Sequence, residues 1–106
     1  MPNSLLLRGV EEFNHGHFFE AHEIWEELWN ETVDDEKRFY QGLIQLAAGY
    51  HKLSLANYRG ARKLLERGQQ ILITFPADYA GLDLSPLLAT TKATLHRLVG
   101  EETPTD

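Results

Sequence analysis

The sequence contains no cysteine, a single methionine and no apolar run long enough to cross a membrane. Without cysteine, we expect neither a disulfide framework nor a thiolate metal site. The first apolar run is Leu5 to Leu7, which Arg8 and two glutamates follow closely. Such a start is typical of neither a signal peptide nor a membrane span, so we expect no membrane contact and a cytoplasmic location.

Basic residues are in the minority: 10 Lys and Arg stand against 16 Asp and Glu, which gives a net charge of −6. The most basic stretch, Arg59 to Arg67, is interrupted by Glu66. A phosphate backbone would therefore be repelled on average, and we expect no nucleic-acid partner. Hydrophobic residues make up 42% of the chain, which is ordinary for a globular protein of one domain.

Strand signals are absent too, whereas apolar residues recur at helical spacing. We therefore predict an all-α protein, a single small helical bundle of about five helices with mostly antiparallel neighbours. The predicted helices cover about residues 4–14, 17–30, 36–55, 58–74 and 85–99. The single helical domain is predicted over residues 1–100, and residues 101–106 are predicted to form a frayed tail.

Turn and cap residues support these boundaries. Gly16 can take the left-handed conformation that closes a helix. Asp34 or Asp35 is expected to cap the third helix and Asn57 the fourth. The pair Ser85-Pro86 reads as a cap followed by proline at the first helical position.

The third helix is predicted to be central, because it is the most hydrophobic. One apolar stripe runs along it, made of Phe39, Leu43, Leu46, Tyr50 and Leu53. Gly42 and Gly49 lie beside this stripe, and mid-helix glycine costs roughly 1 kcal/mol against alanine. We infer that another helix approaches closely at these two glycines.

The segment FNHGHFFEAHEIWEELW places an ionisable pair among aromatic residues. On a helical wheel one side of the second helix faces the core, with Phe18, Ala21, Trp25, Leu28 and Trp29. The opposite side faces water, with Glu20, Glu23, Glu27 and Glu31. His22 and Glu26 lie within the apolar arc, four residues apart, so their side chains can meet. A buried charge needs a partner, so the wheel predicts a polar pair in or along a helix interface.

Further candidate site residues can be grouped with this pair. His22, Glu26 and His51 are the candidate catalytic and metal-binding residues, because imidazole and carboxylate groups do acid–base work and bind divalent cations. The candidate ligand-binding residues are Phe18, Trp25, Trp29, Gln45 and Tyr50. The alternative interpretation is structural: such a pair four residues apart often only satisfies a partly buried polar atom.

Established metal motifs are incomplete here. His22 to Glu26 reads HExxE, and the second histidine of the HExxH zinc motif is missing. Glu12-x-x-His15 matches the Glu-x-x-His element of di-iron bundles, but it occurs once where two copies are needed. His15 and His17 flank Gly16 and are expected to be exposed turn residues.

Three linked motifs resemble one known family. They are FNHGHFFEAHEIWEELW, GLIQLAAGYHKL and NYRGARKLL, and they cover about residues 10 to 72. The chain thereby resembles the small all-helical family catalogued as domain of unknown function 309, whose pattern is roughly FNxGxFFEAHExxExxW, then GLIQxA, a histidine, and an asparagine before Gly-Ala. His22, Glu26, Gln45 and His51 fall on its polar positions. The resemblance implies an all-α fold and no established activity, and it does not extend over residues 75–106.

Two classes of function remain open. The first is a small-ligand binder or metal-assisted hydrolase that uses His22 and Glu26 in an aromatic pocket, with a divalent metal as cofactor. The second, which the sequence favours slightly, is an interaction or structural module that binds a protein partner or a second copy of the chain. Residues Leu46 to Gly68 loosely resemble a tetratricopeptide helix pair, although no 34-residue repeat is visible. Whether the protein is an enzyme is left undecided.

Overall fold

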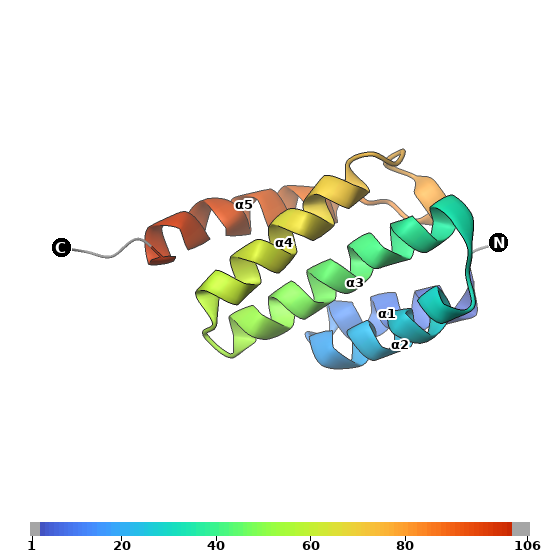
Figure 1. Cartoon of the computed structure of the whole chain (residues 1–106), viewed down its shortest axis with the longest axis horizontal. Helices are drawn as coiled ribbons and strands as arrows, with labels where there is room; N and C mark the ends of the chain where they lie inside the picture. Colours follow the sequence, from blue (N-terminus) through green and yellow to red (C-terminus); the bar gives the residue numbers. More distant parts are fainter. Residues whose placement is uncertain (1–2, 103–106) are drawn as a thin grey trace.

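The computed structural model describes the backbone of residues 3–102 and the side chains of residues 3–99. Figure 1 shows the helices in chain order. They are α1 (Ser4–Asn14), α2 (Phe18–Asn30), α3 (Asp34–Ser54), α4 (Tyr58–Leu72) and α5 (Ser85–Glu102), with a 3₁₀ turn at Tyr79–Gly81 before α5. Within residues 3–102 the chain forms no strand, so the all-α prediction is confirmed. None of these helices has both the length and the apolar character that a membrane crossing requires.

Helix α3 lies at the centre of the bundle, as its hydrophobic composition predicted. It packs against α2 on one side and α4 on the other, while α1 packs on α2 and α5 packs on α4 (Figure 1). The molecule is elongated, with extents of 51 × 25 × 22 Å. The two outer helices, α1 and α5, therefore flank α3 without being each other's main partner, and this leaves room between them.

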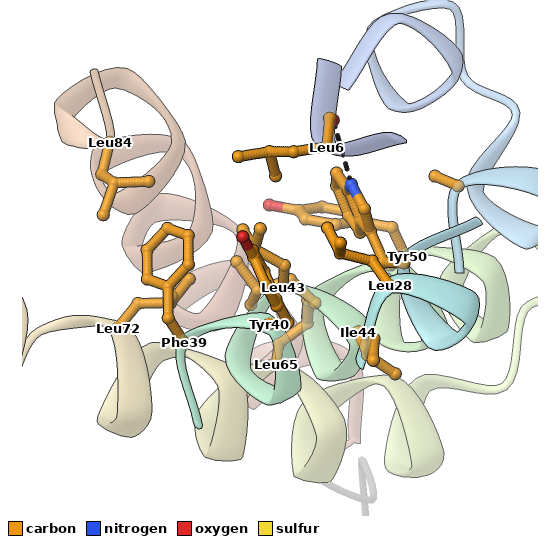
Figure 2. Close-up of a cluster of buried hydrophobic side chains, with 14 of the residues drawn as sticks. Leu6, Leu28, Phe39, Tyr40, Leu43, Ile44, Tyr50, Leu65, Leu72 and Leu84 are labelled. Atoms are coloured by element: carbon orange, nitrogen blue, oxygen red, sulfur yellow. Dashed lines mark hydrogen bonds between the residues drawn. The ribbon is translucent and has the colours of Figure 1, made fainter. Parts of the chain in front are cut away.

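The core follows one side of α3. Figure 2 shows Phe39, Tyr40 and Leu43 of α3 meeting side chains from the neighbouring helices, among them Leu6 of α1 and Leu65 of α4. All five side chains are at most 2% exposed. Most of the predicted apolar stripe of α3 thus lies in the core, and buried residues beside it, such as Tyr40, extend the core around the helix because α2 and α4 cover different sides of it.

Several helix ends behave as their residues predicted. Gly16 adopts a left-handed φ of 81° after α1. The side-chain oxygen Oδ1 of Asn57 accepts a hydrogen bond of 3.0 Å from the amide of Gly60 and so caps α4. These are local signals, and they act through the residues next to them in the chain.

Several predicted ends differ from the structure: α4 already ends at Leu72, and Ser85 is the first residue of α5 and not its cap. Helix α3 begins at Asp34, its N-cap residue is Val33 without a side-chain cap, and Asp34 and Asp35 lie in its first turn. These acids favour the helix start through the macrodipole instead of capping it. Helix α5 continues to Glu102, so the predicted boundary between domain and tail at residue 100 falls inside a helix. Residues 103–106 of the predicted tail lie outside the described residues.

Glycines allow α3 and α4 to approach closely, which confirms the inference from Gly42 and Gly49. A Cβ atom on Gly42 would lie 2.9 Å from the side chain of Leu72, and one on Gly49 would lie 2.8 Å from that of Leu65. A side chain at either position would therefore require the neighbouring leucine or the helix itself to shift.

Candidate functional site

The predicted pair of His22 and Glu26 forms on the surface of α2. His22 Nε2 lies 3.5 Å from Glu26 Oε2. The side chain of His22 is 24% exposed and that of Glu26 is 48% exposed. The imidazole is thus partly buried, whereas the carboxylate lies on the exposed surface and avoids the desolvation cost of burial, so the prediction of a pair within an interface is wrong for Glu26.

His51 joins this pair through an aromatic ring that the sequence analysis left out. The ring of Phe19 stacks on His22 at a centroid distance of 6.0 Å and lies 5.3 Å from the ring of His51. Phe19 is 47% exposed, so it is a surface side chain held between two imidazoles. The wheel places Phe19 at the edge of the apolar arc beside His22 and Glu26, but it does not show the contact with His51 on another helix.

A third potential metal ligand stands next to the pair. Ligand atoms of His22, Glu23 and Glu26 all lie within 4.8 Å of one another. Glu23 is exposed, as the wheel predicted, yet its carboxylate reaches the same side. His22 Nδ1 is buried and has no hydrogen-bond partner among the described residues. One imidazole and two carboxylates are a donor set suited to divalent metals that bind nitrogen and oxygen.

Gln45 stands apart from this cluster. It lies six residues before His51 on α3, and six residues turn an α-helix by about 240° beyond one full circle, which separates the two side chains by about 120°. Its Oε1 is buried without a hydrogen-bond partner among the described residues. Trp29 also has a separate contact: the Lys37 ammonium lies 4.0 Å from the centre of its ring.

Three of the predicted aromatic residues, Phe18, Trp25 and Tyr50, line a pocket between α1 and α5. This α1/α5 pocket has a volume of about 570 Å³. It is lined by Val10, Phe13, Asn14, Gly16, Phe18, Trp25, Leu43, Tyr50, Leu82, Asp83, Leu84, Pro86, Leu87 and Thr90. The structure thus divides the predicted constellation: the aromatic wall belongs to this pocket, and neither His22, Glu26 nor His51 lines it.

Four aromatic rings form one continuous wall of the α1/α5 pocket. Phe13 is central: its ring centroid lies 5.0 Å from that of Phe18, 5.8 Å from that of Trp25 and 5.5 Å from that of Tyr50. Phe18 and Tyr50 stack at 5.4 Å. Because rings in such contact hold each other in place, the wall is formed before any ligand arrives.

The polar atoms of this wall are already occupied. Trp25 Nε1 donates to the carbonyl of Leu6 at 3.2 Å, the contact that ends at Leu6 in Figure 2. The hydroxyls of Tyr50 and Thr91 share a hydrogen bond of 2.9 Å, which ties α3 to α5. What the aromatic wall offers to a ligand is therefore apolar surface.

The rim residues of the pocket escaped the sequence analysis. Asp83 and Thr90 come from the loop before α5 and from α5 itself, and Asn14 comes from the end of α1. Asp83 Oδ1 accepts a hydrogen bond of 3.1 Å from the amide of Ser85, so the carboxylate is fixed at the start of α5. The turn-rich segment from Phe75 to Leu84 was the available signal, because loops on a rigid scaffold often carry binding residues.

A second pocket, of about 490 Å³, is lined by residues from α1, α2, α3 and the turn before α5. Asn3, Glu36 and Tyr40 are among its lining residues. Burial raises the pKa of the Tyr40 hydroxyl to about 12, and the charge of Glu36 and its hydrogen bond add to the effect. This tyrosine therefore remains a neutral hydroxyl over the physiological range.

Comparison with known proteins agrees with the fold and assigns no chemistry. The model of the family described as domain of unknown function (DUF309) matches residues 6–64. An uncharacterized protein of Aquifex aeolicus (strain VF5) is 29% identical over 86 residues, which are 80% of this chain and 26% of that protein. The uncharacterized protein YpuF of Bacillus subtilis (strain 168) is 39% identical over 56 residues, or 52% of this chain and 32% of YpuF.

A solved structure has the same architecture. The crystal structure of the conserved hypothetical protein TTHA0068 from Thermus thermophilus matches with a TM-score of 0.77 at 27% identity, over 91% of this chain and 99% of that one. By contrast, the chain spans only 26% and 32% of the length of the two curated relatives.

Proposed function

The chain belongs to the family described as domain of unknown function (DUF309), and because that membership carries no activity, we propose from its geometry that it is a binding module for a small, mostly apolar molecule. The observation that carries this proposal is the α1/α5 pocket, with its volume of about 570 Å³ and its preformed wall of four aromatic rings. Small-molecule sites are typically of this size, mostly apolar, and supplied with a few polar groups.

The expected affinity follows from the surface that such a ligand buries. A molecule that loses about 200 Å² of apolar surface to the pocket would gain about 5 kcal/mol. Association costs reduce this gain, although a preformed wall keeps them low. We therefore expect dissociation constants on the order of 1 mM for simple aromatic probes, which ligand-observed NMR can measure.

A pocket-filling variant tests the proposal. Thr90 is exposed and lines the pocket, whereas its neighbour Ala89 is exposed and does not. We expect Thr90→Trp to abolish binding of 3-phenylpropan-1-ol and Ala89→Trp to leave it intact. Equal binding by both variants would place the probe elsewhere and remove the support for this site.

A second candidate function is favoured by the His22, Glu23 and Glu26 cluster, whose ligand atoms lie within 4.8 Å of one another. A divalent cation there would stand beside the two exposed carboxylates and could activate a water molecule for hydrolysis. The test is thermal unfolding of chelator-treated protein titrated with Mg²⁺, Mn²⁺, Zn²⁺ and Ni²⁺. A metal site predicts saturable stabilisation that both His22→Ala and Glu26→Gln remove.

The same metal titration also tests whether the α2 surface around His22 and Phe19 serves to bind another protein chain. If no metal stabilises the protein and His22→Ala unfolds at lower temperature, the pair is structural. Phe19, 47% exposed between His22 and His51, would then be the residue through which a protein partner or a second copy binds. Sedimentation of wild type against Phe19→Ser would detect self-association, for which an interface of more than about 1,000 Å² is expected.

A further inference from the structure

The α1/α5 pocket is lined by negative charge only, among the described residues. Among the described residues that line it, Asp83 is the only one with a charged side chain, and no lysine, arginine or histidine lines it. The whole chain carries a net charge of −6 as well. Both the local carboxylate and the overall field therefore attract cations and disfavour anions at this pocket.

The hydrogen-bonding atoms of the wall do not offset this preference. The indole N–H of Trp25 already donates to Leu6, and the hydroxyl of Tyr50 is bonded to Thr91. A ligand that enters the pocket therefore meets ring surfaces and aliphatic side chains inside. At the mouth it meets the exposed carboxylate of Asp83. Aromatic faces also attract cations, which adds to the same preference.

We propose that the α1/α5 pocket binds an organic cation: an ammonium group paired with Asp83 at the rim, attached to an apolar body that packs against Phe13, Phe18 and Tyr50. This inference rests on the proposed function, because it specifies the ligand class of the same pocket. Asp83 suits the role, since Oδ1 is held by the Ser85 amide and the carboxylate is thereby kept at the rim.

Three probes of the same shape separate the contribution of the head-group charge from that of the apolar body. They are 3-phenylpropylammonium, 3-phenylpropan-1-ol and 3-phenylpropionate, which share a body and differ in the charge of the head group. We expect the ammonium to bind about threefold to fivefold more tightly than the alcohol, the range of a partly exposed ion pair, and the carboxylate to bind most weakly. Raising the salt concentration from about 0.01 M to about 1 M should weaken the preference, because screening shortens the reach of charge.

The matched variants are Asp83→Asn and Asp78→Asn. Asparagine at position 83 keeps an oxygen that can accept from the Ser85 amide, so α5 can still begin there. Asp78 is exposed and does not line the pocket, so its replacement removes a charge without touching the site. We expect Asp83→Asn to make the ammonium and the alcohol bind equally and Asp78→Asn to preserve the preference.

The outcomes distinguish the two proposals. Equal binding of ammonium and alcohol by the wild-type protein, insensitive to salt, would overturn the cation inference and leave the pocket as an apolar site. Failure of all three probes to bind would overturn the proposed function itself. A cation preference that survives in Asp83→Asn and disappears in Asp78→Asn would move the ion pair away from the pocket and refute the inference.

Discussion

Tyr40 illustrates how one buried residue makes the stability of this protein depend on pH. Its side chain is 2% exposed, and burial raises the pKa of its hydroxyl from 10.0 to about 12. In the unfolded chain the same hydroxyl loses its proton near its ordinary pKa. Above that pH the unfolded state binds fewer protons than the native state, and the native state loses stability as the pH rises.

We therefore predict that the contribution of Tyr40 to the free energy of unfolding is fully present below pH 10 and is lost between pH 10 and about 12. Urea unfolding at a series of pH values measures this slope. Tyr40→Phe should show a shallower decline over the same window, whereas Tyr58→Phe, at an exposed position, should decline like the wild type. Identical slopes for the wild type and Tyr40→Phe would contradict the prediction.

For single residues, the sequence predicted one contact of the candidate site and did not predict another. The helical wheel found His22 and Glu26, and they do meet, because a spacing of four residues on one helix fixes their proximity. The wheel placed Phe19 beside this pair but missed its contact with His51, which lies on another helix. A contact between helices depends on their relative rotation, which the periodicity of one helix does not specify.

At the scale of elements, the close packing of α3 on α4 depends on three glycines. A Cβ atom on Gly68 would lie 2.7 Å from the side chain of Leu46 and 2.9 Å from the carbonyl oxygen of Gly42. The second contact is with backbone, so a change of rotamer does not relieve it. The helices themselves would have to move apart.

We predict that Gly68→Ala destabilises the protein by about 1–3 kcal/mol, the usual cost of overpacking. This result would run against local propensity, because alanine favours an isolated helix by roughly 1 kcal/mol over glycine. Chemical denaturation measures the change, and Gln70→Ala, on the exposed side of the same helix, should have little effect. A stabilised Gly68→Ala protein would show that α4 can shift without cost.

At the scale of the whole molecule, the helices differ in how well they are enclosed. Helix α3 packs against both α2 and α4, whereas the main contact of α5 is with α4. Resistance to local opening follows the number of partners that must separate. The hydrogen bond between Tyr50 and Thr91 is one of the few features that tie α5 back to α3.

We predict that amide hydrogen exchange is slowest in α3 and fastest, among the helices, in α5. Native-state exchange followed by NMR provides the measurement residue by residue. Thr91→Val, which removes the partner of the Tyr50 hydroxyl while keeping the side-chain shape, should speed exchange in α5 more than in α2. Equal protection of α3 and α5 would mean that the bundle opens only as one unit.

The amino-acid sequence by itself determined the class of fold, the order of the helices and most of their ends. Periodicity, caps such as Asn57 and the turn at Gly16 act within a few residues, so they can be read without a structure. It also sufficed for family membership, because the linked motifs lie along the chain.

Only the tertiary structure decided which residues share a site. Phe13, Tyr50 and Asp83 come from distant parts of the chain, and they line one pocket because α1 and α5 both flank α3. Phe18 and Trp25 line this pocket and His22 does not, although all three lie on one helix. Which side chains of two helices meet depends on how they fill the space between the helices, and the periodicity of a single helix does not encode that.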